Sequence, residues 1–412
     1  MNDSIVYSKQ GAMTEIEENG ENLIMEFKHW SRLGENARIF MFLPYAVLKK
    51  SPENPSIILA NTLLFILALM ALFWGFWEID KAYLGLLLIV LINTSSFYIY
   101  EVYGRENVFA LMSIVFFIVL GLNLKLLTNH KKNIYVSLVL LIVSSFLIGL
   151  ISEIRNEAAI VLCSLILLIV LARELNIKMK GLYLIVVIAV FMLTKQSIQL
   201  YFEKNFESTA ELVQKHGGHV YTGDRIKGHK LWHPIFCGLG DFDTKYGYKW
   251  NDKVAYQYAV PILREQYKID VNYSGKYYLD DYYDNDSLYY KKFDEIPEYE
   301  HIVKEKVLGD IKNDFWWYAE IILKRISRTM TQTNPFQYIG WILIPMIILL
   351  FYRKNYFYLF LLMISLPLSA TSILIYSGDG STNNSVFGFF IVIIFISIIY
   401  EIIAKKLRKS DT

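Results

Sequence analysis

The chain has 412 residues, of which 54% are hydrophobic and only 19% are charged. Its mean hydropathy is +0.33, and its apolar residues occur in blocks of roughly 15 to 22, close to the length that a helix needs to cross a bilayer. This distribution excludes a set of soluble domains and predicts an all-α polytopic membrane protein. A net charge of +2 gives no electrostatic reason to expect a nucleic-acid partner. Two cysteines exclude a disulfide scaffold and a cysteine-rich metal site.

We expect nine transmembrane helices, separated mostly by short polar connections. Their ranges are 57–77, 83–100, 107–124, 133–151, 158–172, 181–200, 338–352, 356–376 and 386–404. The chain therefore divides into a polar N-terminal segment with a juxtamembrane helix (1–56), six spans (57–200), a tyrosine-rich loop domain (201–337), and three spans with a basic tail (338–412).

Lysine and arginine predict the orientation, because they concentrate in the cytoplasmic loops of membrane proteins. Thirteen of them lie on one side of the predicted spans: Lys81, Lys125, Lys131, Lys132, Arg173, Lys178, Lys180, Arg353, Lys354, Lys405, Lys406, Arg408 and Lys409. The short connections on the other side hold only Arg105 and Arg155, and Lys195 near the outer end of the sixth span does not reverse the contrast. We therefore expect a cytoplasmic C-terminus, with both polar segments outside. The abundance of Ile, Lys, Asn and Tyr is typical of an AT-rich bacterial genome and favours a bacterial inner membrane.

The beginning of the chain shows no cleavable signal peptide, because residues 1–10 lack an apolar core. An outward segment of this polarity needs an element that carries it across the membrane. We expect the gene product to begin further upstream, with a first signal-anchor helix; unassisted translocation of the N-terminus is the alternative.

Charged residues lie beside the ends of the spans in the outward connections. They are Glu101, Arg105 and Glu106 in one connection, Glu153, Arg155 and Glu157 in the next, and Asp379 in the last. A charge inside the hydrocarbon costs on the order of 2.5–3.5 kcal/mol, so such groups normally face water or a polar cavity. Arginine suits phosphate because its planar fork donates in parallel pairs, and a carboxylate can accept the proton of a hydroxyl. These arginines and carboxylates together suit the binding of a lipid phosphate and an acceptor alcohol. The alternative is that they anchor the helices at the membrane interface or form ion pairs with one another.

The loop domain has one dense stretch at residues 228–240, in which His229, Trp232 and His233 lie among glycines. Two histidines four residues apart could bind a metal from one face of a helix. Pro234 and the glycines predict an irregular loop instead, and no third ligand is evident. We therefore expect no required cofactor, although a divalent metal is compatible with the sequence. Aromatic faces with polar edges suit sugar rings, and a loop packed at the membrane interface is the alternative.

Residues 303–330 carry apolar side chains at spacings of three and four, which predicts an amphipathic helix. Trp316 and Trp317 widen its apolar face. We expect this helix to lie on the outer leaflet, with a helix packed inside the loop domain as the alternative.

The layout and several short motifs resemble the GT-C superfamily of membrane glycosyltransferases, and within it bacterial proteins similar to protein O-mannosyltransferases. The motifs are Arg155-Asn156-Glu157, the Trp-His pair and the Gly-Leu-Gly tripeptide within 228–240, and Asp3-Ser4-Ile5-Val6-Tyr7. The first resembles an Arg-x-Glu at the outer end of a mid-chain helix, and the last resembles the Asp-x-x-x-Tyr that follows the first helix of the family. The last outward connection departs from the pattern, because relatives often have an arginine there and this chain has Asp379-Gly380-Ser381-Thr382.

The resemblance implies an inverting glycosyltransferase at the outer face of the membrane. Its donor would be a polyprenyl-phosphate sugar, its acceptor a hydroxyl of a glycan, lipid or protein, and its other partners the membrane lipids. The catalytic base would be Asp3, if the upstream helix exists, with Glu35 as the alternative and Glu101 or Glu106 as a second acid. The implied substrate-binding residues are Arg105, Arg155, Glu157, His229, Trp232 and His233.

Two other functions fit parts of the pattern. A polysaccharide polymerase or ligase would also use lipid-linked sugars. A transporter would place polar sites near the bilayer midplane, on broken helices and often in repeated halves, whereas here the charges collect at the outer boundary and the halves do not resemble each other. A catalytically inactive relative is a further alternative.

Overall fold

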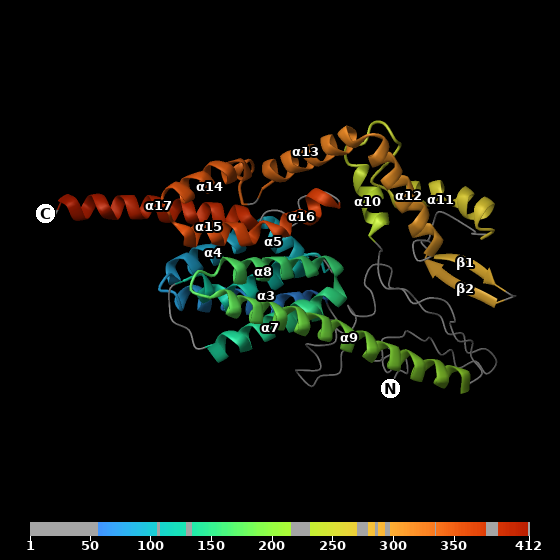
Figure 1. Ribbon diagram of the computed structural model, residues 1–412, viewed down its shortest axis with the longest axis horizontal. Coiled ribbons are helices and arrows are strands. Elements are labelled where there is room, and N and C mark those ends of the chain that lie inside the picture. Colours follow the sequence, from blue (N-terminus) through green and yellow to red (C-terminus); the bar gives the residue numbers. More distant parts are fainter. Residues whose placement is uncertain are drawn as a thin grey trace. The chain divides into compact units, whose positions relative to one another are not determined.

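The computed structural model describes residues 57–104, 108–128, 134–215, 231–269, 279–284, 287–292, 297–333, 335–375 and 386–410. These residues are helical apart from connections and one antiparallel hairpin of β1 (Leu279–Asp284) and β2 (Ser287–Lys292). The described chain divides into two compact units. The membrane unit contains residues 57–198, 327–371 and 386–410, and the polar unit contains residues 199–326 and 372–375. Figure 1 labels the elements of both.

Among the described residues, five helical stretches are long and apolar enough to cross a membrane. They are α3 (Ile57–Trp77), α7 (Ile134–Ile154), the apolar part of α9 (Ile177–Lys215), α15 with α16 (Tyr356–Ser365 and Pro367–Leu374), and the apolar part of α17 (Val386–Ser410). These stretches identify the chain as an integral membrane protein, as expected from the sequence.

Four further apolar helical stretches are shorter and also coincide with predicted spans. They are α4 (Ala82–Thr94), α6 (Leu111–Asn123) with η2 (Leu124–Leu127), η3 (Asn156–Ala159) with α8 (Ile160–Leu171), and η5 (Ile339–Ile342) with α14 (Leu343–Tyr352). Their length alone does not establish that they cross the bilayer, so the total of nine spans stays a prediction.

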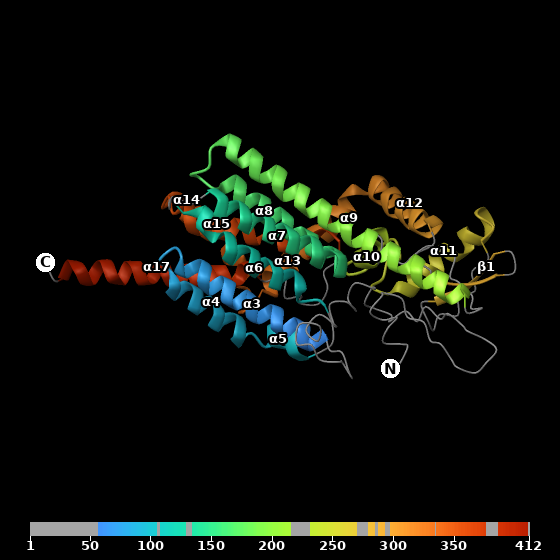
Figure 2. The ribbon, with the colours of Figure 1, turned by 90° about the horizontal axis from the view of Figure 1, so that it is seen from below.

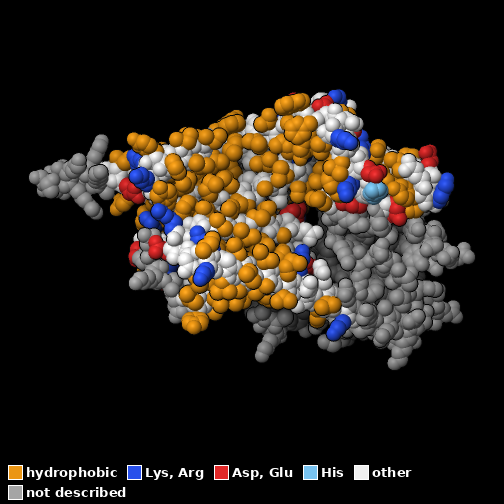
Figure 3. Space-filling view, viewed as in Figure 1, with side chains coloured by type: hydrophobic (Ala, Val, Ile, Leu, Met, Phe, Trp, Pro, Cys, Tyr) orange, Lys and Arg blue, Asp and Glu red, His pale blue; other side chains and the backbone are white. Residues whose placement is uncertain are grey.

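The membrane unit is built around α6, of which nearly every residue is buried. Helices α3, α7 and α8 contact it, and Figure 2 shows the three running beside it. Gly75 of α3 and Gly121 of α6 bring the two backbones together, since a Cβ at Gly75 would lie 2.2 Å from the carbonyl oxygen of Gly121. Asn123 donates a hydrogen bond of 2.7 Å to the hydroxyl of Ser144, which ties α6 to α7. Hydrophobic side chains cover much of the face of the membrane unit that Figure 3 shows, as expected of a surface in contact with lipid.

The polar unit has a core of its own, formed where α10 (Trp232–Leu239), α11 (Asp252–Gln266) and α12 (Pro297–Asn313) pack together. The irregular loop predicted for residues 228–240 is wrong for residues 232–239, because these residues form the helix α10. Pro234 lies in its first turn, where the missing N–H would have had no intrahelical acceptor, so the proline does not interrupt the helix.

The single helix expected over residues 303–330 is also wrong, because α12 ends at Asn313 and α13 spans Phe315–Thr331. Asp314 separates them, and its carboxylate accepts a hydrogen bond of 3.0 Å from the backbone N–H of Trp317, which caps α13. Val303 of α12 lies in the core of the polar unit, so the packed-helix alternative is right for this part. Helix α13 buries Trp317 but leaves Trp316 81% exposed, and its position at the membrane surface stays a prediction.

Candidate functional site

The described residues include half of those expected to act in catalysis or binding. Glu101, Arg155 and Glu157 belong to the membrane unit, and Trp232 and His233 belong to the polar unit. Asp3, Glu35, Arg105, Glu106 and His229 lie outside the described residues, as does Asp379. The predicted residues therefore form two groups, one in each unit.

Glu101 lies in a π-helical turn, η1 (Tyr100–Gly104), directly after α5 (Ser96–Ile99). Its side chain is only 3% exposed, and η1 packs against α3. π-helical turns are rare and occur frequently at functional sites. A carboxylate buried between apolar membrane helices is costly, and such residues commonly serve a function. Glu101 is thus a strong candidate for a proton acceptor among the described residues.

Arg155 and Glu157 form an ion pair at the start of η3, with 3.1 Å between Nη2 and Oε1. The guanidinium also lies over the ring of Phe109, 4.3 Å from its centroid. Phe109 belongs to the connection that follows Glu101, so two connections that we predict to face outward meet at this contact. The mutual ion pair was one of our alternatives for these residues. It is compatible with a phosphate-binding role, because a guanidinium carries five N–H donors and one carboxylate oxygen accepts from one of them.

A second ion pair lies beside the first and was not predicted. Lys195 of α9 lies 3.1 Å from the carboxylate of Glu153 at the end of α7. The signal in the sequence was present, because Lys195 is the only charged residue within 181–202 and Glu153 precedes Arg155 by two positions. These two pairs and Glu101 make the predicted outer end of the membrane unit polar.

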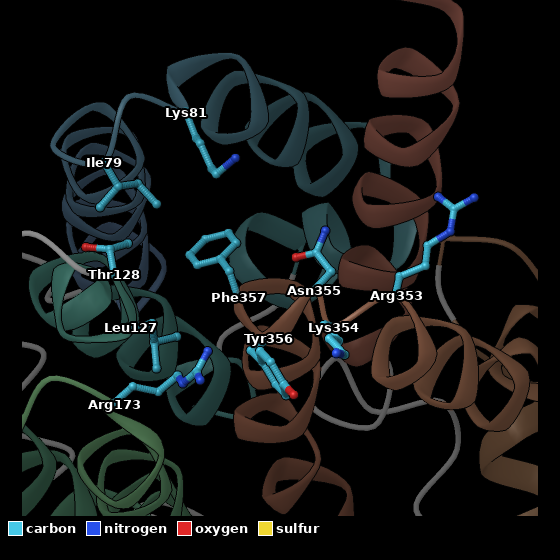
Figure 4. A pocket seen from close by; sticks show the side chains of 10 residues that line it. All are labelled: Ile79, Lys81, Leu127, Thr128, Arg173, Arg353, Lys354, Asn355, Tyr356 and Phe357. Atoms are coloured by element: carbon cyan, nitrogen blue, oxygen red, sulfur yellow. The ribbon is translucent and has the colours of Figure 1, made fainter. Parts of the chain in front are cut away.

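The opposite ends of the membrane helices form a basic pocket of about 540 Å³. Its described lining includes four cationic side chains, Lys81, Arg173, Arg353 and Lys354, and no carboxylate. Figure 4 labels these side chains together with Tyr356 and Phe357, and the side chain of Arg353 points away from the others. Arg173 lies 4.3 Å from the centroid of Tyr356. Such a pocket suits an anionic lipid head group, and its lining includes none of the residues expected to catalyse.

In the polar unit, His233 joins α10 to both α11 and α12. Its imidazole is 2% exposed and stacks on the ring of Tyr256, with 5.3 Å between centroids. Nε2 lies 3.2 Å from Oδ1 of Asp252, and Nδ1 lies 2.5 Å from the hydroxyl of Tyr299. Cys237 lies one turn after His233 on α10, and its sulfur is 3.7 Å from Nε2 and 3.6 Å from the same Oδ1.

Local sequence explains how these groups meet. The side chain of Asn251 accepts a hydrogen bond of 3.0 Å from the backbone N–H of Lys253 and caps α11, which places Asp252 at its first position. Cys237 could have been found from its i, i+4 spacing to His233 if α10 had been predicted as a helix. Asp252 could not, because its approach depends on how α10 and α11 pack.

Trp232 begins α10, and its backbone N–H donates a hydrogen bond of 2.8 Å to the carboxylate of Glu300 on α12. The ammonium of Lys304 lies 5.9 Å from the centre of its ring. The residue therefore fixes the start of α10 against α12, and its role in binding a sugar stays a prediction.

The segment after α10 serves to shape the polar unit. Gly240 lies against the backbone of Lys249, since a Cβ there would be 2.1 Å from the Lys249 carbonyl carbon. Asp241 lies 3.8 Å from Nε of Arg325, which is fully buried and donates a hydrogen bond of 3.2 Å to the carbonyl of Ile373. The Gly-Leu-Gly tripeptide and Asp241, which follows it, thus hold the segment in place.

Asp243 organises the next turn. Its carboxylate accepts hydrogen bonds from the backbone N–H groups of Lys245, Tyr246 and Tyr248 and from the indole of Trp317. Partial burial alone would raise the pKa of Asp243, but these hydrogen bonds outweigh burial and hold the pKa below its ordinary value.

The chain matches no family model, no curated protein and no solved structure. The resemblance to the GT-C superfamily accordingly depends on the layout and on the short motifs alone.

Proposed function

We propose that this chain is a membrane glycosyltransferase of the GT-C type, which moves a sugar from a polyprenyl-phosphate donor to an acceptor hydroxyl at the outer face of a bacterial inner membrane. The observation that carries the proposal is the buried carboxylate of Glu101 in a π-helical turn, at the same end of the membrane unit as the Arg155–Glu157 pair. A proton acceptor and a guanidinium at one end of apolar helices are the groups that sugar transfer from a lipid phosphate requires.

In the proposed reaction, a carboxylate accepts the proton of the acceptor hydroxyl. The hydroxyl oxygen attacks the anomeric carbon, the bond from that carbon to the phosphate oxygen breaks, and polyprenyl phosphate leaves with the bonding electrons. The sugar is transferred with inversion. Glu101 is the base among the described residues, while Asp3 and Glu106 are the other acids that the family resemblance implies. General-base catalysis contributes roughly 10²–10⁴-fold to the rate.

Arg155 would stabilise the negative charge that develops on the leaving phosphate. Its stacking on Phe109 and its pairing with Glu157 hold the guanidinium in one orientation, so little side-chain freedom is lost when phosphate binds. Arg155→Lys retains the charge but loses the planar fork, and we expect it to weaken donor binding.

The experiment measures transfer of labelled sugar from several polyprenyl-phosphate donors to membrane acceptors. Glu101→Gln should reduce the rate by at least about 10²-fold, because an amide cannot accept the proton. Glu78→Gln is the matched control, since it removes the carboxylate that pairs with Lys125 at the opposite end of the helices. Equal activity of the Glu101 and Glu78 variants, with both inserted in the membrane, would remove Glu101 from the mechanism.

A further inference from the structure

We propose that His233, Cys237 and Asp252 form a zinc-binding site in the polar unit. Nε2 of His233, Sγ of Cys237 and one carboxylate oxygen of Asp252 lie within 4.8 Å of one another. The three residues come from α10 and from the first position of α11. The proposed sugar transfer was argued from Glu101 and Arg155 in the membrane unit, so the zinc site does not rest on it. The zinc site does assign His233, which the family resemblance implied as a substrate-binding residue, to a metal instead.

The spacing of the three atoms fits a tetrahedral zinc ion. Zinc binds nitrogen and oxygen at about 2.0–2.2 Å and sulfur at about 2.3 Å, so its tetrahedral ligands lie roughly 3.3–3.6 Å from one another. The separations here are 3.2 Å for nitrogen and oxygen, 3.6 Å for sulfur and oxygen, and 3.7 Å for sulfur and nitrogen. Each agrees with the zinc value to within about 0.2 Å, so an ion at their centre would contact all three with little rearrangement.

The second nitrogen of His233 is held as a metal-bound imidazole requires. A ligating histidine usually donates its other ring N–H to an oxygen, which fixes the ring and its tautomer. Nδ1 lies 2.5 Å from the hydroxyl of Tyr299, and the ring stacks on Tyr256. Both tyrosines are fully buried, so the core of the polar unit aims Nε2 at Cys237 and Asp252.

The donor types select zinc over the common hard cations. A thiolate and an imidazole suit zinc, whereas magnesium and calcium prefer oxygen ligands. The thiolate and the carboxylate together carry two negative charges, which a divalent ion neutralises. His233 and Cys237 are buried, whereas the side chain of Asp252 is 39% exposed, so an ion can reach the site past Asp252.

Three protein ligands leave one coordination position for water or another small ligand, as in exchangeable and catalytic zinc sites. The bound ion would join α10 to the start of α11 and thereby stabilise the polar unit, because metal that binds only the folded state adds its binding free energy to stability. A cluster held by hydrogen bonds alone is the competing explanation, with the thiol and the imidazole both directed at one oxygen of Asp252.

The test is a titration of the full-length protein, purified in detergent and freed of metal, with Co²⁺ followed by Zn²⁺. The expected result is one cobalt ion per chain, with a thiolate-to-cobalt band in the near ultraviolet and intense visible bands of tetrahedral cobalt, both abolished when zinc displaces cobalt. Zinc should also raise the unfolding temperature of the wild type.

Two variants and a control separate the site from adventitious binding. Cys237→Ser should abolish the thiolate band, and Asp252→Asn should keep the band but weaken cobalt binding by at least about tenfold. Cys163→Ser, which replaces the other cysteine, in α8 of the membrane unit, should behave as the wild type. Circular dichroism checks that each variant is folded. If Cys237→Ser is not folded, Asp252→Asn still tests the site.

A wild-type titration without a thiolate band would overturn the proposal, as would a band that survives Cys237→Ser or disappears in Cys163→Ser. None of these readouts involves sugar transfer. A failed zinc site therefore leaves the proposed glycosyltransferase standing, and an inactive transferase leaves the zinc site standing.

Discussion

Replacing Gly240 by alanine should destabilise the polar unit strongly. The added Cβ would lie 2.1 Å from the carbonyl carbon of Lys249, 2.2 Å from its Cα and 2.5 Å from its nitrogen. These are backbone atoms, which cannot rotate away as the end of a flexible side chain can. The chain on one side of the contact must therefore move by more than an ångström, which disturbs the segment that carries Asp241 and Asp243.

The expected cost follows from that geometry. Overpacking a well-packed site costs about 1–3 kcal/mol, and a clash with backbone belongs at the upper end, at about 3 kcal/mol. Gly309 provides the matched control, because it lies inside α12 and a Cβ there meets no atom within 4 Å. Gly309→Ala should stabilise the protein by up to about 1 kcal/mol through helix propensity. The effect of the glycine-to-alanine change on the free energy of unfolding should thus differ between the two positions by about 4 kcal/mol.

Thermal unfolding in detergent, followed by tryptophan fluorescence and by protease cleavage of the polar unit, measures this difference. For a unit of more than 100 residues each kcal/mol corresponds to roughly 4 °C, so the Gly240→Ala transition should fall by roughly 12 °C. If Gly240→Ala unfolds at the same temperature as Gly309→Ala, the close approach to Lys249 does not hold the segment, and an architectural role for the Gly-Leu-Gly tripeptide is refuted.

Two further predictions concern acidity and orientation. Because the folded-state pKa of Asp243 lies below its ordinary value, its stabilising contribution is complete above the unfolded pKa of about 4 and is lost as the pH falls through the lowered folded pKa. Asp243→Asn should therefore lower the free energy of unfolding at pH 7, and the difference from the wild type should shrink below pH 4. Unfolding curves recorded across this pH range measure that difference, and a difference independent of pH would contradict the prediction. In a chain without its two native cysteines, Ser287→Cys should react with an impermeant thiol reagent from outside the cell and Ser410→Cys should not, and the reverse pattern would overturn the orientation.

The membrane helices could be predicted because hydropathy is a property of each local segment. The five long apolar stretches and the four shorter ones lie where the sequence indicates them. The Arg155–Glu157 ion pair was likewise foreseeable as an alternative, since the residues are two positions apart.

The polar unit was harder to predict, because its structure depends on contacts between distant segments. Pro234 suggested a loop, but a proline in the first turn of a helix is tolerated, and α10 forms. The apolar spacing over residues 303–330 continues across Asp314, so the pattern alone did not show that Asp314 caps a new helix there. Asp252 meets His233 and Cys237 only through the packing of α10 against α11, and no spacing in the sequence reveals it.

One measurement tests the proposed function most directly. Purified wild-type protein is reconstituted into liposomes that contain a labelled polyprenyl-phosphate sugar and membrane acceptors, and both the labelled product and the uptake of soluble sugars are followed. The proposal predicts that the donor is consumed, that the label appears on an acceptor with inverted anomeric configuration, and that no soluble sugar accumulates. Accumulation of a soluble solute without consumption of any lipid-linked donor would contradict the glycosyltransferase proposal and favour a transporter.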